Sequence, residues 1–171
     1  RIVKAVYEAA LNNRVKLAKM AAEETGMGKW EDKVLKNVVG SLYVYESIKN
    51  MKTCGLISEN FETGISEIAQ PIGPVLAIVP CTNPTSTVMF KVLIALKTRN
   101  PIIISAHHRA LECCRETVNI LYKAALEQDA PEDCIIFFER KTREDTGDLM
   151  SDPRLALILA SKCLIAASSC L

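Results

Sequence analysis

Four short, continuous apolar runs in the second half of the chain constrain its fold more than any other feature. They are residues 75–79, 102–104, 134–138 and 155–159. Runs of this length without polar interruption are typical of strands buried on both faces of a parallel sheet. Segments of helical periodicity separate them, at about 84–97, 109–128 and 142–150. This alternation predicts an α/β fold with a doubly wound parallel sheet.

The first half of the chain has a different pattern. Apolar residues recur at helical spacing over 1–25 and 30–50, which predicts two amphipathic helices, the first with a possible break at Asn12–Asn13. Residues 53–57 and 65–69 have the pattern of two strands, and the alternation in the second predicts one exposed face. We therefore divide the chain into a helical region (1–50), a two-stranded element (51–72) and a partial Rossmann-like domain (73–171).

Composition excludes several classes of function. The chain has 171 residues, 49% of them hydrophobic, with 21 Lys and Arg against 20 Asp and Glu. That content is too apolar for intrinsic disorder, and a net charge of +1 provides no general attraction for nucleic acid. No apolar run reaches the ~20 residues needed to span a bilayer, and no basic-then-apolar leader is visible. We expect a cytoplasmic protein that binds neither nucleic acid nor membrane.

The seven cysteines do not follow the spacing of a metal site. No CxxC pair occurs, and the only histidines are the adjacent His107 and His108. We therefore expect no structural metal. In the absence of a secretory leader we expect the cysteines to be reduced and to act mainly as small buried hydrophobes.

Polar residues follow three of the four apolar runs, where the predicted strands end. They are Pro80–Ser86, Ser105–Arg109 and Ala160–Cys163. Ligands in open α/β sheets bind beyond these carboxyl ends. Asn83 and Pro84 are predicted as the N-cap and first residue of the next helix, whose N-terminus favours an anion. The alternative, which stays open here, is that Asn83 only caps this helix.

Charge and glycine content add two constraints on a nucleotide site. Between Ile68 and Leu111 there is no acidic residue, whereas four basic residues occur: Lys91, Lys97, Arg99 and Arg109. This local excess favours attraction of a phosphate-bearing cofactor, although buried strands and their helices carry few charges in any case. Neither GxGxxG nor GxxxxGKS/T occurs, so a nucleotide would have to bind without the usual glycine motif.

Six short motifs in the first two thirds of the chain share the order and spacing of one enzyme family. They are Ala21–Gly28, Glu31–Asn37, Lys52–Gly55, Ile68–Gly73, Ile78–Thr87 and Ala95–Asn100. On these motifs, residues 5–160 resemble the CoA-acylating aldehyde dehydrogenases, and in particular the aldehyde dehydrogenase half of the bifunctional aldehyde-alcohol dehydrogenases. The resemblance implies N-terminal helices, a protruding two-stranded element that bridges subunits, and a Rossmann-like sheet that binds NAD without the glycine motif.

The resemblance also implies a reaction and a site. An aldehyde, CoA and NAD give an acyl-CoA and NADH, through a cysteine thiolate that attacks the aldehyde. The residues implied to lie against the nicotinamide are Pro80, Cys81, Thr82 and Asn83. Either Thr82 or Asn83 is implied as the catalytic oxyanion-hole residue, and the sequence does not choose between them.

Other cofactor contacts implied by the resemblance fall on positions that differ from the family. Ser105 stands where related enzymes have a ribose-binding lysine, and His108 stands where they have an acid, so the choice between NAD and NADP stays open. His107 and Ser161 are further implied contacts. The family sequence Ala-Thr-Gly-Gly-Pro-Gly after the fourth strand is here Ala160–Ile165, without glycine.

The family's nucleophilic cysteine lies beyond Leu171, and none of the seven cysteines stands in its place. We therefore expect the chain to be an N-terminal fragment of such an oxidoreductase, without its catalytic domain and not active alone. A homo-oligomer or a catalytic-domain partner is expected to complete it. The alternative is a non-catalytic relative that binds a nucleotide or a partner chain.

Overall fold

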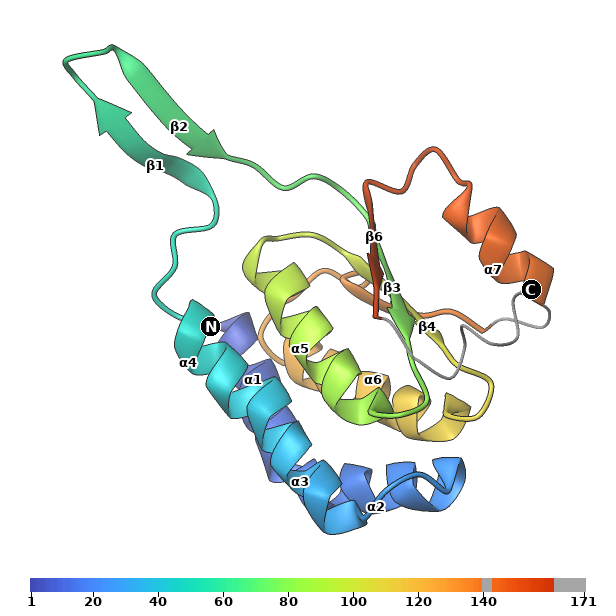
Figure 1. The fold of residues 1–171 in the computed structure, drawn as a ribbon. Helices are drawn as coiled ribbons and strands as arrows, with labels where there is room; N and C mark the ends of the chain where they lie inside the picture. The colour runs from blue at the N-terminus through green and yellow to red at the C-terminus, as the bar shows by residue number, and fades with distance from the viewer. Residues whose placement is uncertain (140–142, 162–171) are drawn as a thin grey trace.

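The chain forms an α/β fold, as predicted, in which layers of helix cover one face of a parallel sheet (Figure 1). The computed structural model describes residues 1–139 and 143–161. The sheet has the strand order β5-β4-β3-β6. Its strands are β3 (Val75–Val79), β4 (Ile102–Ala106), β5 (Ile135–Phe137) and β6 (Leu157–Ala160), all parallel to their neighbours. The predicted runs therefore mark all four strands, with ends displaced by up to two residues.

Helices α5 (Pro84–Lys97) and α6 (Leu111–Leu126) cover one face of this sheet. The helices of the N-terminal region pack against their outer side, and the hydrophobic core lies between these layers. Helix α7 (Arg143–Met150) lies on the opposite side of the sheet in Figure 1. None of the helices within residues 1–139 and 143–161 is long and apolar enough to cross a membrane.

The N-terminal region has more breaks than the sequence predicts. Its helices are α1 (Ile2–Asn12), α2 (Arg14–Thr25), α3 (Trp30–Val38) and α4 (Val44–Ile48), with a π-helix η1 (Val39–Tyr43) between the last two. The break after Asn12 is confirmed. The single helix predicted over 30–50 is wrong in detail, because η1 interrupts it where Gly40 meets the first turn of α5. A Cβ at Gly40 would lie 2.7 Å from the Ser86 carbonyl oxygen, so only glycine fits this approach.

Strands β1 (Gly55–Asn60) and β2 (Ile65–Ala69) form an antiparallel ribbon that projects from the body (Figure 1). Two features of the prediction are wrong. The ribbon starts two residues later than expected, because the Thr53 hydroxyl donates a hydrogen bond to the Lys97 carbonyl and holds the preceding segment to α5. Nearly every ribbon residue is exposed, on both faces, because the ribbon stands away from the core.

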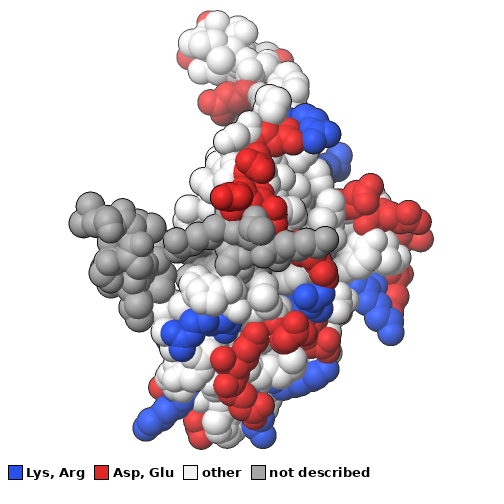
Figure 2. Space-filling model, turned by 90° about the vertical axis from the view of Figure 1, so that its right-hand side faces the viewer, with Lys and Arg blue, Asp and Glu red and all other residues white. Residues whose placement is uncertain are grey.

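Burial of the sheet is uneven between its two faces. Strand β3 is buried along almost its whole length, as predicted. Strand β6 is mostly exposed, and Ile136 of β5 is 38% exposed, so these two strands are less buried than β3. Figure 2 views the molecule from the side of β6 and α7, where acidic and basic side chains are interspersed. Among the described residues only α7 covers this side.

Candidate active site

The strand order locates the place where an open α/β sheet binds its ligands. The chain runs from β3 to β4 and β5 in one direction and then returns to β6, on the other side of β3. The switch point is therefore the crevice between the carboxyl ends of β3 and β6. The predicted loop Pro80–Asn83 follows β3, and Ser161 follows β6, so the fold brings these two candidates to the same crevice.

Asn83 lies at the N-cap position of α5, and Pro84 is the first residue of the helix, as predicted. The capping hydrogen bond is absent, however: among the described residues the Asn83 side chain accepts none from α5. Its Oδ1 atom is buried and has no hydrogen-bond partner there. Its backbone carbonyl instead accepts hydrogen bonds from the Thr87 N–H at 3.2 Å and hydroxyl at 2.7 Å. Asn83 therefore stands at the N-cap position without making the side-chain capping bond, and a further role for it stays a prediction.

Side chains of α3 form hydrogen bonds with the loop before α5 and with the first turn of that helix. The Lys33 ammonium donates a hydrogen bond to the Thr82 carbonyl at 2.8 Å. Asn37, one turn further along, accepts a hydrogen bond at 2.8 Å from the hydroxyl of Thr85, in the first turn of α5. Burial lowers the pKa of Lys33, and the charge of the neighbouring Lys36 lowers it further. Both Lys33 and Asn37 are buried.

A second buried lysine ties the two strands at the switch point. The Lys91 ammonium, on α5, donates hydrogen bonds to the Ile78 carbonyl of β3 at 2.8 Å and the Leu159 carbonyl of β6 at 2.6 Å. Burial lowers the pKa of Lys91 to about 8. The ammonium thus ties β3 to β6 close to their carboxyl ends, beyond which the candidate site lies.

The four basic residues counted as a phosphate-attracting group do not gather at the crevice, so that prediction is wrong. Lys91 is bound to strand carbonyls. Lys97 is the last residue of α5 and Arg99 lies just beyond it, at the end far from the crevice, where the Lys97 ammonium donates to the Lys49 carbonyl. Arg109 donates to the carbonyl of Thr25 at the end of α2. Spacing along the chain alone did not show this, because Lys91 lies in the middle of α5 and the next two residues lie at or beyond its C-terminal end.

The candidates after β4 lie beside the same edge. Ser105 is buried within β4 and pairs with Ile78 of β3. The His107 N–H donates to the Val79 carbonyl at 3.1 Å, and its Nδ1 accepts from the Arg109 N–H at 3.2 Å. His107 therefore fixes the start of the loop after β4 against the end of β3. The cofactor contacts of Ser105, His107 and Ser161 stay predictions.

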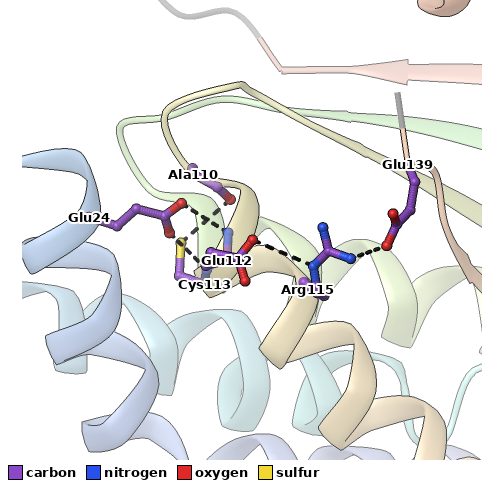
Figure 3. A network of polar contacts seen from close by, with 6 residues as sticks. All are labelled: Glu24, Ala110, Glu112, Cys113, Arg115 and Glu139. Atoms are coloured by element: carbon purple, nitrogen blue, oxygen red, sulfur yellow. Dashed lines mark hydrogen bonds and ion pairs between the residues drawn. The ribbon is translucent and has the colours of Figure 1, made fainter. Parts of the chain in front are cut away.

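The N-terminus of α6 is occupied by a side chain of the protein itself (Figure 3). The Glu24 carboxylate, from α2, accepts hydrogen bonds from the backbone N–H groups of Glu112 and Cys113 at 2.9 and 2.8 Å. Burial acts to raise the pKa of Glu24, but hydrogen bonds from Cys113 and the α6 backbone outweigh it and hold this pKa below its usual value. Arg115, one turn on, pairs with Glu112 and Glu139.

The described cysteines offer no exposed thiol at the crevice. Cys81, Cys113, Cys114 and Cys134 are buried, Cys54 is half-buried, and none of these five forms a disulfide. A hydrogen bond with Cys114, burial and the Glu24 carboxylate all raise the pKa of the Cys113 thiol. Within the described part of the chain no three histidine, cysteine or acidic side chains gather as a metal site would require.

Sequence reasoning missed Lys33, Asn37 and Glu24. Their partners lie 49, 48 and 88 residues away along the chain, so local pattern alone could not pair them. One signal was available: Lys33 and Asn37 stand four residues apart within the Glu31–Asn37 motif, and that spacing puts two polar side chains on one helix face.

Comparison with known proteins now decides the family. Residues 1–160 match the aldehyde dehydrogenase family. The chain belongs to the aldehyde dehydrogenase family. It is 47% identical over 161 residues to the bifunctional aldehyde-alcohol dehydrogenase of Escherichia coli K12, covering 94% of this chain and 18% of that enzyme.

Solved structures of this family share the fold. An acetylating aldehyde dehydrogenase from Geobacillus thermoglucosidasius is 43% identical, with a TM-score of 0.92 over 98% of this chain and 37% of that one. An engineered glycolyl-CoA reductase with bound NADP+ is 28% identical, with a TM-score of 0.79 over 99% of this chain and 38% of that one. The chain thus spans less than two fifths of each relative. The predicted resemblance to the acylating aldehyde dehydrogenases is confirmed.

Proposed function

We propose that this aldehyde dehydrogenase chain forms the nicotinamide side of a CoA-acylating enzyme, which converts an aldehyde, CoA and NAD+ to an acyl-CoA, NADH and a proton. The observation that carries the proposal is Asn83. Its side chain lies at the switch point and makes no capping bond among the described residues, with a buried Oδ1 left unpartnered. A polar group of this kind is costly unless a ligand or the reaction uses it.

The arrangement suits the stabilisation of a developing negative charge. Asn83 stands at the N-terminus of a 14-residue helix, whose dipole favours an anion. With Oδ1 buried, the carboxamide nitrogen is the group free to donate toward an aldehyde oxygen. Asn83 is therefore the stronger oxyanion-hole candidate, and Thr82 supplies the preceding peptide.

The cofactor loop fits a nicotinamide nucleotide, since it is neutral, polar and backed by the unpartnered Asn83 oxygen. When bound, the nicotinamide accepts the hydride. The residues proposed to hold it are Pro80, Cys81, Thr82, Asn83, Ser105, His107 and Ser161. Position 108 is a histidine, and the glycolyl-CoA reductase relative has NADP+ bound, so the proposal covers both nucleotides.

We propose that the nucleophilic thiol is none of the five described cysteines. Four of them are buried, and the Cys54 thiol lies 3.8 Å from the Thr98 carbonyl at the far end of α5. Cys163 and Cys170 lie outside the described residues. The thiol and the CoA site then belong to a further catalytic segment or chain. The domain division at 50 and 72 is kept as part of this proposal.

The ribbon supports a homo-oligomer. Its exposed apolar residues include Phe61 at 86%, Ile65 at 61% and Ile68 at 62% exposure, and its strands leave open edges for pairing with another chain. We expect sedimentation to give a dimer or larger species, and Phe61→Ser with Ile68→Ser to shift it toward monomer. A monodisperse monomer in the unaltered chain would contradict the expectation.

The absence of disulfides among the described cysteines supports a cytoplasmic location.

A hybrid enzyme tests the proposed activity. Residues 1–160 replace the matched segment of the Escherichia coli bifunctional enzyme, and acetyl-CoA formed from acetaldehyde, CoA and NAD+ is measured by chromatography. The account predicts acetyl-CoA formation that requires all three substrates. The alcohol dehydrogenase activity of the other half reports whether the hybrid folds. A hybrid that keeps this second activity and forms no acetyl-CoA would favour the alternative, a non-catalytic binding module.

A further inference from the structure

The helix beneath the candidate site has an unusual distribution of side chains. Along α3 and η1, the face turned to the protein interior carries Lys33, Asn37 and Gly40, at intervals of four and three residues. This spacing keeps all three on one side of the helix. We call these three residues the α3 seam. Apolar residues of the same segment, Leu35, Val39 and Tyr43, are instead exposed.

Each residue of the α3 seam meets a successive part of the loop and first turn of α5. Lys33 donates to the Thr82 carbonyl at 2.8 Å, and Asn37 accepts from the Thr85 hydroxyl at 2.8 Å. Gly40 admits the Ser86 carbonyl, which would lie 2.7 Å from any Cβ there. The contacts fix the segment on both sides of Asn83, while Asn83 itself makes none with α3.

Burying the Lys33 side chain here costs free energy, unless the charge of its ammonium group makes a favourable interaction. Lys33 is 4% exposed, and a lysine ammonium loses most of its hydration when it is enclosed. An apolar side chain would pack there at lower cost. Electrostatic interaction with Cys113 on α6 and Cys81 in the site loop acts to raise the pKa of Lys33, against the effect of burial. Its hydrogen bond to Thr82 is the directional contact it makes.

That bond determines the orientation of one peptide group. The Thr82–Asn83 peptide is trans, as are all peptides described, so its carbonyl and N–H point in opposite directions. Because Lys33 holds the carbonyl toward α3, the Asn83 N–H faces away from α3. No hydrogen bond within residues 1–139 and 143–161 uses this N–H. The same peptide group also helps to set the direction in which the Asn83 side chain leaves the backbone.

We propose that Lys33 is a positioning residue, whose ammonium holds the Thr82 carbonyl and thereby aims the Asn83 peptide and carboxamide at the aldehyde oxygen. The proposal rests on the proposed function. It assigns no contact with substrate to Lys33. Asn37 and Gly40 pack against the first turn of α5. The proposed oxyanion donors of Asn83 are therefore held by rigid helices on both sides.

The hybrid enzyme tests the kinetic consequence. Lys33→Met keeps the volume and removes the donor, and we expect kcat for acetyl-CoA formation to fall about tenfold or more while KM for acetaldehyde and NAD+ changes little. Lys33→Arg retains a donor and should recover part of kcat. Lys36→Met, an exposed position on the same helix, is the matched control. Equal kcat in Lys33→Met and the control would overturn the proposal, as would an Arg variant no better than Met.

A second measurement separates this inference from the proposed function. In the 171-residue chain labelled with ¹³C and ¹⁵N, Lys33→Met should shift the Thr82 carbonyl and Asn83 amide resonances, and Lys33→Arg should return them toward their original positions. Unchanged resonances in Lys33→Met would overturn the positioning role whatever the hybrid does. An inactive but folded hybrid with shifted resonances would instead remove the proposed function and leave Lys33 as the residue that orients this peptide.

Discussion

The N-termini of α5 and α6 face the same edge of the sheet, yet they are completed in opposite ways. At α6, the Glu24 carboxylate accepts hydrogen bonds from two N–H groups and uses up the positive end of the helix. At α5, the Asn83 side chain caps nothing among the described residues, and Lys33 and Asn37 hold the segment through its carbonyl and hydroxyl groups. One anion-favouring helix end is thus occupied by the protein's own carboxylate, and the other has no side-chain cap among the described residues.

Under the proposed function, this difference explains why the junction before α5, and not the one before α6, is the site. A helix end already paired with a carboxylate repels a second anion, whereas an uncapped end retains its unpaired N–H groups. The supporting groups also differ in charge, since α5 is anchored by the ammonium groups of Lys33 and Lys91 and α6 by a carboxylate. The two junctions should therefore respond differently to substitution and to pH.

Asn83→Ala should have the largest effect, and it should fall on activity. In the hybrid enzyme we expect kcat for acetyl-CoA formation to fall about a hundredfold, as when one oxyanion donor is removed. Unfolding free energy should change by less than about 0.5 kcal/mol, since no capping bond is lost. Asn83→Ser restores a good capping residue without the carboxamide and should be as inactive. A stable, active Asn83→Ser variant would assign Asn83 to capping after all.

Glu24→Ala should produce the next largest effect, and it should fall on stability. Loss of the α6 cap should cost about 1 kcal/mol of unfolding free energy in urea titrations. Because hydrogen bonds hold the Glu24 pKa below its usual value, its contribution is present above the ordinary glutamate pKa and is lost as the pH falls through the folded value. The difference between Glu24→Ala and the unaltered chain should thus shrink in acid.

The neighbouring exposed residue provides the control for this experiment. Glu23→Ala should leave stability unchanged, and in the hybrid Glu24→Ala should leave kcat nearly unaltered. Equal destabilisation by the two substitutions would show that the carboxylate is not a cap. A large loss of kcat in Glu24→Ala would show that the α6 end belongs to the site, against the comparison made above.

The effect of Lys91 should appear only on the alkaline side, as a change in the pH dependence of stability. Its folded pKa of about 8 lies below the ordinary lysine value, so between these two values the unfolded chain binds more protons. Unfolding free energy should therefore rise as the pH increases above about 8, and Lys91→Met should lack this rise. Lys97→Met, at the other end of α5, is the control and should keep it. The same pH slope in Lys91→Met and the unaltered chain would contradict this assignment.

The sequence predicts the sheet well because its strands are read from local apolar runs. The boundaries of α5 follow from Asn83, Pro84 and the apolar period after them. The ribbon is harder to predict, since residues 65–69 alternate as in a half-buried strand although no described part of the chain covers either face. Local pattern records which residues are apolar, and tertiary position decides which of them are buried.

The candidate site likewise has one part that the local sequence predicts and one part that it does not. The loop 80–83 could be predicted, because ligand sites follow strand ends and the loop is polar. Its support could not, since the bonds from Lys33 and Asn37 join segments almost fifty residues apart. The prediction of a cationic cluster is wrong for the complementary reason: charges close in sequence need not be close in space, and the last turns of α5 carry Lys97 and Arg99 away from Lys91.

The most direct test of the central claim is a titration of the isotopically labelled chain with NAD+, followed by amide resonances at the two helix ends. The account predicts that the resonances of Thr85 and Ser86 at the start of α5 move with the cofactor, while those of Glu112 and Cys113 at the start of α6 stay in place. Movement at α6 without movement at α5, or no movement at saturating cofactor, would contradict the assignment of the site to the end of β3.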